Sequence, residues 1–207
     1  ATDGKTSWLG SGTLIANGWV LTVAHVTEGV TGATFTINGV DAIVDAAITY
    51  PGWVGNTVDG TDIGLMHLAD PTTFSSVTPA TLYSGHSELG AVVTMVGYGL
   101  TGNGLTGGTT YDGVKRAATN VIDRISDYSV LWADFDNPNA FFAADDNVYG
   151  SSIALDMEGA IDHGDSGGGL FVTTTNGVFL VGANAFGIGF DGITNSDYGD
   201  VVGFTRV

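Results

Sequence analysis

The chain has 207 residues and carries 22 acidic against 5 basic side chains, a formal net charge of −17 at pH 7. This excess argues against nucleic acid and against an anionic membrane surface as partners, because both are bound through clustered Lys and Arg. Hydrophobic residues make up 43% of the chain, enough for a sizeable core, and the absence of cysteine excludes disulfides, thiolate metal sites and a cysteine nucleophile.

The first elements along the chain are predicted β-hairpins. Asn and Gly both tolerate positive φ, which a type I′ hairpin turn needs at its two central positions. Three of the four Asn-Gly pairs lie between apolar runs, at Asn17-Gly18, Asn38-Gly39 and Asn176-Gly177. Further strands are expected over 42–50, 62–68, 91–98, 117–122, 129–133 and 201–207. No segment has a helical stripe longer than two turns, so the sequence predicts an all-β protein.

The segment 71–90 is the best candidate for a linker, because it holds two of the four prolines and many Ser and Thr residues. It divides the chain into a predicted N-terminal domain, 1–80, and a C-terminal domain, 81–207. Uncharged stretches elsewhere are interrupted by Gly, Asn, Ser and Thr, and none is the continuous apolar run of a spanning helix. We therefore expect no membrane insertion.

The sharpest local motif is Gly164-Asp165-Ser166-Gly167-Gly168. A serine between glycines suits a sharp turn that exposes its hydroxyl and lets a substrate backbone approach. Consecutive backbone N–H groups in such a turn can also bind a developing oxyanion. A plain glycine-rich hairpin loop is the alternative interpretation of the same residues.

A serine nucleophile needs a base, and the chain has four histidines. His25 directly follows an expected hairpin strand and is the candidate base. His67 lies within an apolar strand and fits a structural role, whereas His86 lies in the linker and is expected to be solvated. His163 immediately precedes Gly164, a position suited to lining the site but poor for a base.

The base in turn needs a carboxylate that orients it. Asp62 opens the apolar strand 62–68, where a carboxylate can be buried. Asp59 lies in the preceding turn and is the typical turn-forming aspartate. Asp62 is therefore the candidate third member of the site.

Together these contexts resemble the trypsin/chymotrypsin-like serine peptidases, including their order His, Asp, Ser. The motifs that carry the resemblance are Gly12-Thr13-Leu14-Ile15, Thr22-x-Ala24-His25, Asp62-Ile63-Gly64-Leu65, Gly97-Tyr98-Gly99, Gly164-Asp165-Ser166-Gly167-Gly168, Ala185-Phe186-Gly187 and Phe204-Thr205-Arg206-Val207. The resemblance implies two antiparallel six-stranded β-barrels with the site in the cleft between them. His25 and Asp62 would come from the first barrel and Ser166 from the second.

The resemblance also implies the roles. Ser166 is the nucleophile, His25 the base and Asp62 the group that orients it, with the N–H groups of Gly164 and Ser166 as the oxyanion hole. The expected protein is a secreted, monomeric endopeptidase that acts on polypeptides without a cofactor, its signal peptide already removed. The alternative is a non-catalytic or latent protease-like domain used for binding.

Substrate-binding residues follow from the same resemblance. Ala160 would form the floor of the pocket for the residue before the cleaved bond, Val202 its rear wall and Gly187 its entrance. The segment Ala185-Phe186-Gly187 would pair with the substrate backbone, and His163 would line the site. With no carboxylate at the floor, a buried Arg or Lys would lack a counter-charge, so we expect small or medium apolar residues to be preferred. Asp191 is the residue that would reverse this preference.

Two departures from the family pattern concern activity. Ala185 stands where the family usually has a serine that bonds the triad carboxylate. In the family, a freed N-terminal amine pairs with the Asp beside the nucleophile, here Asp165, and the start of this chain does not match the usual one. We therefore expect Asp165 to lack a partner and the oxyanion hole to be the fragile part of the site.

A second acidic feature is Asp134-Phe135-Asp136, followed by Asp145-Asp146-Asn147. Oxygen ligands at alternating positions suit Ca²⁺, although the Gly and the distal Glu of an EF-hand loop are missing. A solvated acidic loop is the interpretation we favour, so no metal is expected. A calcium site at Asp134 and Asp136 is the alternative.

Overall fold

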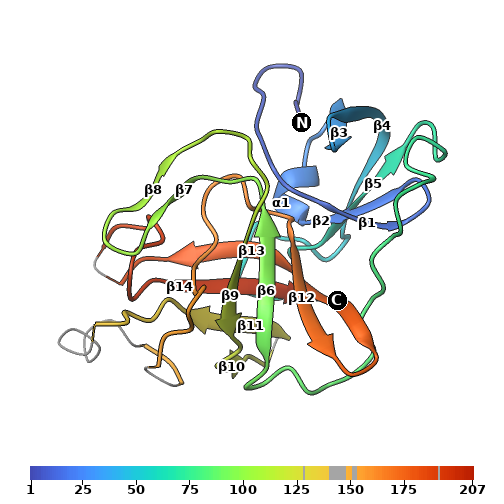
Figure 1. Cartoon of the computed structure of the whole chain (residues 1–207). Coiled ribbons are helices and arrows are strands. Elements are labelled where there is room, and N and C mark those ends of the chain that lie inside the picture. Colours follow the sequence, from blue (N-terminus) through green and yellow to red (C-terminus); the bar gives the residue numbers. More distant parts are fainter. Residues whose placement is uncertain (128, 140–147, 151–152, 191) are drawn as a thin grey trace.

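The computed structural model describes residues 1–127, 129–139, 148–150, 153–190 and 192–207. Strands dominate it, together with one four-residue helix in the described part of the chain (Figure 1). In chain order the elements are β1 (Thr13–Ala16), β2 (Trp19–Thr22), α1 (Ala24–Thr27), β3 (Ala33–Ile37), β4 (Val40–Thr49), β5 (Gly64–Leu68), β6 (Val92–Gly97), β7 (Thr101–Asn103), β8 (Gly107–Thr110), β9 (Arg116–Val121), β10 (Arg124–Ile125), β11 (Val130–Asp134), β12 (Gly169–Thr174), β13 (Gly177–Ile188) and β14 (Val201–Arg206).

Two curled antiparallel sheets form the body of the molecule. Among the described residues, the first sheet has five strands in the order β1-β2-β5-β4-β3 and the second has seven, β10-β11-β14-β13-β12-β6-β9. The predicted all-β, two-barrel fold is thereby confirmed, with five and seven strands in place of six and six. The N-terminal segment adds no strand because Thr2 makes only isolated bridges to Ser7 and Gly32, and the short β10 extends the second sheet.

The predicted hairpins form at all three Asn-Gly pairs. Between β3 and β4, Asn38 has φ 52° and Gly39 has φ 77°, the pair of positive values that a type I′ turn requires. The other expected strands are present with ends shifted by two residues at most. The sequence prediction missed β7, β8 and β10, because β7 and β8 are built from Gly, Thr and Asn without alternation and β10 has two residues.

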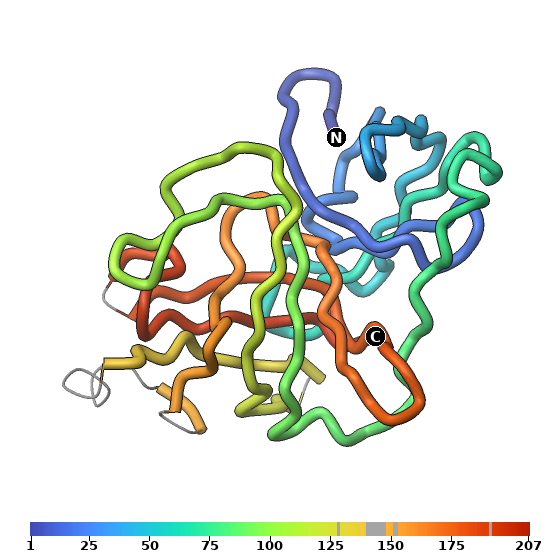
Figure 2. The backbone as a smooth tube through the Cα atoms, in the orientation of Figure 1, coloured from blue at the N-terminus to red at the C-terminus, as the bar shows by residue number. Residues whose placement is uncertain are grey.

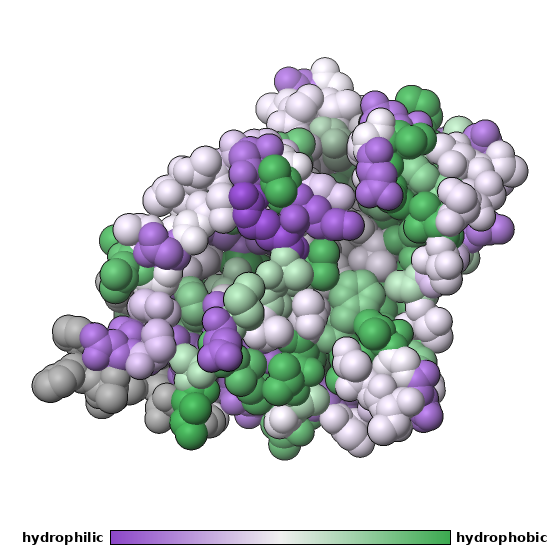
Figure 3. Space-filling view, in the orientation of Figure 1, coloured by the Kyte–Doolittle hydropathy of each residue, from purple (hydrophilic) through white to green (hydrophobic). Residues whose placement is uncertain are grey.

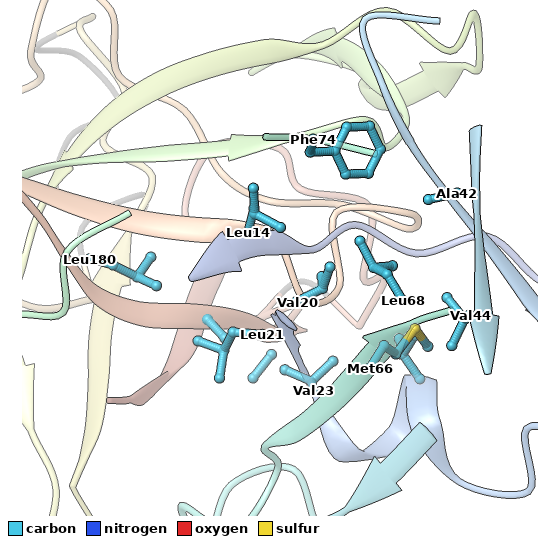
Figure 4. Packing of buried hydrophobic residues seen from close by; sticks show 13 residues of the cluster. Leu14, Val20, Leu21, Val23, Ala42, Val44, Met66, Leu68, Phe74 and Leu180 are labelled. Atoms are coloured by element: carbon cyan, nitrogen blue, oxygen red, sulfur yellow. The ribbon is translucent and has the colours of Figure 1, made fainter. Parts of the chain in front are cut away.

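The core of the first sheet also includes side chains from the second. Figure 4 shows Leu14, Val20 and Leu68 packed together, with Leu180 of β13 approaching from the other sheet. Burying one such side chain is worth about 1.5–3 kcal/mol. This shared core fixes the second sheet against the first, and so fixes the cleft between them.

The segment between β5 and β6 crosses from one sheet to the other (Figure 2). It is bonded to both, since the N–H of Ala80 donates to the Leu14 carbonyl and that of Tyr83 to the Leu180 carbonyl, each at 2.8 Å. The buried carboxylate of Glu88 accepts a hydrogen bond of 2.8 Å from Arg206 Nε of β14. The division of the chain into domains at residue 80 stays a prediction.

Figure 3 shows hydrophobic residues in several separate patches among polar ones on the face in view. Scattered exposed apolar residues of this kind are ordinary on protein surfaces. Within the described residues, no helix has the length and hydropathy needed to cross a membrane.

Candidate active site

His25 and Asp62 meet at one end of β2 and β5, two neighbouring strands inside the first sheet. The single helical turn α1 follows β2 directly and presents His25, while Asp62 lies two residues before β5. Gly64, the first residue of β5, permits this approach because a Cβ there would lie 2.6 Å from Thr27 Oγ1 of α1. The pairing of β2 with β5, in which Thr22 lies opposite Gly64, thus brings the two side chains together.

Asp62 is completely buried and holds His25 at two points. Its Oδ2 accepts a hydrogen bond of 2.7 Å from His25 Nδ1, and its Oδ1 accepts one of 2.9 Å from the His25 backbone N–H. These bonds offset the cost of burying the carboxylate. Because Nδ1 carries the proton, the neutral imidazole has an unprotonated Nε2 that can accept one.

The loop that carries Ser166 requires glycine on both sides. Gly164 has φ +95° and Gly167 has φ +85°, values that favour glycine. A Cβ on Gly167 would also lie 1.9 Å from Thr22 Oγ1, so the loop packs against β2 only with glycine at this position. The motif recognised in the sequence is therefore a tight turn set against the first sheet.

Two N–H groups of this turn remain without a hydrogen-bond partner among the described residues, those of Gly164 and Ser166. Their neighbours' N–H groups are all used within the fold: Asp165 donates to the Asp162 carbonyl at 2.9 Å, Gly167 to that of Asn184 at 2.8 Å and Gly168 to that of Asp165 at 2.8 Å. Two free donors on either side of one residue are what an oxyanion hole needs.

Asp165, expected to lack a partner, has two. Its Oδ1 accepts the N–H of Gly99 at 2.8 Å and its Oδ2 accepts the N–H of Asp162 at 2.9 Å. The expectation was wrong because backbone amides replace the amine, and because Gly97 leaves room: a Cβ there would lie 1.9 Å from Asp165 Oδ1. Burial raises the pKa of Asp165, and the two N–H donors oppose that rise.

His25, His163, Gly164 and Ser166 line one cleft of about 720 Å³. Its other walls come from the N-terminal segment, α1 and the segments beside the β7–β8 hairpin: Ser7, Trp8, Leu9, Val26, Glu28, Leu100 and Tyr111. The sequence prediction missed these walls, since no local pattern marks them. In the described residues, the Ser166 hydroxyl makes no hydrogen bond to His25.

Of the residues predicted to bind substrate, His163 is the most accessible. Its side chain is 78% exposed, and its Nδ1 is 2.8 Å from Asp162 Oδ1. Phe186 is half-buried and packs edge-on against Trp132, with ring centroids 4.9 Å apart. Gly187 pairs with Val202 between β13 and β14.

The other predicted pocket residues lie away from that cleft. Ala185 is buried in the core, and Val202 is 0% exposed, so the structure gives substrate no access to Val202 as a rear wall. Ala160 lines a second pocket, of about 350 Å³, together with Asp162 and Asp165. The sequence prediction that no carboxylate lies near Ala160 was therefore wrong, because Asp162 and Asp165 line the same pocket. Asp191 lies outside the described residues.

The remaining histidines have partners of their own. His67 Nδ1 is 2.7 Å from Asp45 Oδ1, and the His67 ring packs edge-on against Trp19. The exposed His86 accepts a hydrogen bond at Nδ1 from the Arg206 guanidinium. Neither histidine lines the cleft that contains Ser166.

Among the described residues, no group of three or more His, Asp and Glu side chains is arranged to hold a metal ion. Asp134 Oδ2 accepts the N–H groups of Val148 and Tyr149 at 2.6 and 2.9 Å. Burial raises the pKa of Asp123 to about 7, and the nearby carboxylates of Asp134, Asp136 and Glu158 add to the rise. The acidic residues at 145–147 lie outside the described residues, and calcium binding at Asp134 and Asp136 stays a prediction.

Comparisons with known proteins bear on the family and the fold of the chain. The sequence model of the family described as Trypsin matches residues 2–206, nearly the whole chain. A solved structure titled as HL collagenase aligns with a TM-score of 0.63 at 18% identity, over 95% of this chain and 80% of that one. That likeness shows a shared fold. No curated protein matches the chain.

Proposed function

The chain belongs to the trypsin family of serine proteases, and from that premise we propose that it is an endopeptidase acting through an acyl-enzyme on Ser166. The observation that carries the proposal is the two-point hydrogen bonding of His25 by the buried Asp62, beside a cleft that Ser166 also lines. This supports a base whose tautomer and orientation are fixed before substrate arrives.

In the proposed reaction, Ser166 Oγ attacks the carbonyl carbon of the scissile bond while His25 Nε2 takes the hydroxyl proton. The negative charge that develops on the carbonyl oxygen is met by the N–H groups of Gly164 and Ser166. Protonated His25, stabilised by the Asp62 carboxylate, then gives its proton to the leaving amine. Water, with His25 again as base, hydrolyses the acyl-enzyme and restores Ser166.

We further propose that the protein is secreted, acts as a monomer and cleaves polypeptides after small or medium apolar residues. The side chain of Ala160 carries no charge and supports the apolar preference, whereas Asp162 and Asp165, which line the same pocket, favour a basic residue. The strongly acidic chain supports a partner other than nucleic acid.

One observation favours a second candidate, a latent or non-catalytic protease-like binding domain. Within the described residues, no hydrogen bond joins the Ser166 hydroxyl to His25, and a serine without that contact is a weak nucleophile. Catalytic hydrogen bonds in free enzymes often tighten only when substrate binds, so the contact need not be present beforehand.

A fluorophosphonate probe separates the two candidates, because covalent labelling requires an activated serine. Wild-type protein should be labelled, and Ser166→Ala should not be. Ser126→Ala, which removes a serine hydroxyl near β10, serves as the matched control and should be labelled like the wild type. Unlabelled wild-type protein that is folded by circular dichroism would favour the latent domain.

A further inference from the structure

Ser11 connects the segment before β1 to the nucleophile loop, 153 residues further along the chain. Its backbone N–H donates to the Ser166 carbonyl at 2.7 Å. Its hydroxyl donates to the Gly164 carbonyl at 2.8 Å and accepts the N–H of Tyr98 at 3.2 Å. Ser11 is buried, so water is a poor substitute for these contacts.

The orientation of the two free N–H groups depends on the carbonyls of the same peptide units. In a trans peptide the N–H and C=O point in opposite directions, so anchoring the carbonyl aims the N–H. The His163 carbonyl accepts the N–H of Leu100 at 2.9 Å, which aims the Gly164 N–H. The Asp165 carbonyl accepts the N–H of Gly168 at 2.8 Å, which aims the Ser166 N–H.

The peptide unit between these two, Gly164–Asp165, is held by Ser11. Within the described residues, the Ser11 hydroxyl is the hydrogen-bond donor to the Gly164 carbonyl. The N–H of the same unit, that of Asp165, donates to the Asp162 carbonyl at 2.9 Å, so loss of the Ser11 contact removes one of its two anchors. Gly164 has φ +95° and the conformational freedom of glycine, which lets the unit tilt about the anchor that remains. Such a tilt would displace the two N–H groups that flank the unit, those of Gly164 and Ser166.

We propose that Ser11 is a positioning residue for the oxyanion hole, acting through the Gly164 carbonyl without touching the substrate. The inference rests on the proposed function, since an oxyanion hole matters only if Ser166 attacks a carbonyl. An interaction that orders the hole contributes chiefly to the transition state, so its loss lowers kcat and leaves KM unchanged.

The test is steady-state kinetics of Ser11→Ala on a peptide ester that the wild-type protein hydrolyses. We expect kcat to fall about tenfold, the cost of one buried hydrogen bond, with KM unchanged. Direct loss of an oxyanion donor costs more, about 10²–10³-fold. Affinity for a peptidyl trifluoromethyl ketone, which forms a tetrahedral adduct, should fall by the same factor as kcat/KM.

Two variants separate positioning from simple stability. Ser11→Thr keeps the hydroxyl and should restore kcat, even if its extra methyl group lowers the melting temperature. Ser126→Ala removes a hydroxyl that accepts the Val130 N–H at 3.3 Å, and should leave kcat and KM unchanged. If Ser11→Ala fails to fold, Ser11→Cys replaces it, because a thiol is a similarly shaped but weak donor.

Wild-type kcat in Ser11→Ala, or in Ser11→Cys where that variant is used, would overturn the inference while leaving the proposed function intact. Equal losses in Ser11→Ala and Ser11→Thr would also overturn it, since they would show a structural role. Wild-type protein without esterase or peptidase activity would overturn the proposed function and this inference together.

Discussion

The carboxylate of Asp62 accepts hydrogen bonds from both the ring and the backbone N–H of His25, and so fixes the position of the backbone as well as the orientation of the ring. The backbone bond anchors the start of the short helix α1, which has no side-chain cap of its own. The ring bond selects the tautomer with Nε2 unprotonated. An amide in place of the Asp62 carboxylate keeps one oxygen that can accept the His25 backbone N–H. Such a replacement should therefore lower kcat much more than it displaces His25.

Asp62→Asn should lower kcat by about 10⁴-fold, the cost of a wrong imidazole tautomer in enzymes with this triad. The amide still accepts the His25 N–H through its oxygen, so the fold should persist. The control is Asp59→Asn in the preceding turn, where the carboxylate accepts the Thr61 N–H at 3.0 Å. Steady-state kinetics on a peptide ester compares the two, and equal kcat in both would refute the role of Asp62.

Gly97→Ala should inactivate the protein without unfolding it. The new Cβ would lie 1.9 Å from Asp165 Oδ1 and displace the carboxylate that anchors the loop. If the Gly164 N–H moves with it, kcat should fall about 10²–10³-fold. Gly32→Ala is the control, because its Cβ meets nothing closer than 3.7 Å. Full activity in Gly97→Ala, with an unchanged melting temperature, would show that Asp165 does not govern the oxyanion hole.

The parts of the molecule that follow local rules could be predicted from the sequence. Asn38-Gly39 forms its turn because both residues tolerate positive φ, and Gly164 and Gly167 flank the serine turn for the same reason. The fold followed from such turns and from motifs in a characteristic order. Strands without side-chain alternation, such as β7 and β8, gave no comparable signal.

The contacts that stabilise the site could not be predicted. The partners of Asp165 are backbone N–H groups, which every residue except proline carries, so the identities of Gly99 and Asp162 do not reveal them. The bond from Ser11 to Gly164 joins residues far apart in the chain, and a serine before a strand has many ordinary roles. The sequence predicted His25, Asp62 and Ser166 as the reacting side chains, and the structure shows the backbone contacts around them.

Stability should fall as pH rises through about 7, because of Asp123. Its pKa is raised to about 7 by burial first and then by the charges of Asp134, Asp136 and Glu158. Between an unfolded pKa of about 3.9 and this value, the folded protein binds more protons than the unfolded chain. The contribution is therefore fully present below about 3.9 and is lost as pH rises through about 7.

Melting temperatures of wild type and Asp123→Asn, measured from pH 5 to pH 9, test this prediction. The amide cannot ionise, so the variant should show a flatter profile and exceed the wild type at the alkaline end. Asp127→Asn, which changes an exposed carboxylate four residues further along the chain, is the control. Parallel profiles for wild type and Asp123→Asn would contradict the assignment.

Substrate preference depends on which side chains meet the residue before the cleaved bond. Ala160 offers no charge, so Ala, Val or Leu should be preferred, with each methylene changing kcat/KM by about 10–200-fold. Asp162 and Asp165 line the same pocket as Ala160, and Asp162 Oδ2 is buried without a hydrogen-bond partner among the described residues. A basic side chain that reached Asp162 would therefore find a counter-charge.

A peptide-library cleavage profile decides between these outcomes, with Ala160→Asp and Asp162→Asn as paired variants. If Ala160 forms the floor, Ala160→Asp should shift cleavage toward Arg and Lys, whereas Asp162→Asn should leave the apolar preference unchanged. Dominant cleavage after Arg or Lys in the wild type, abolished in Asp162→Asn, would reject the apolar pocket and make Asp162 the specificity determinant.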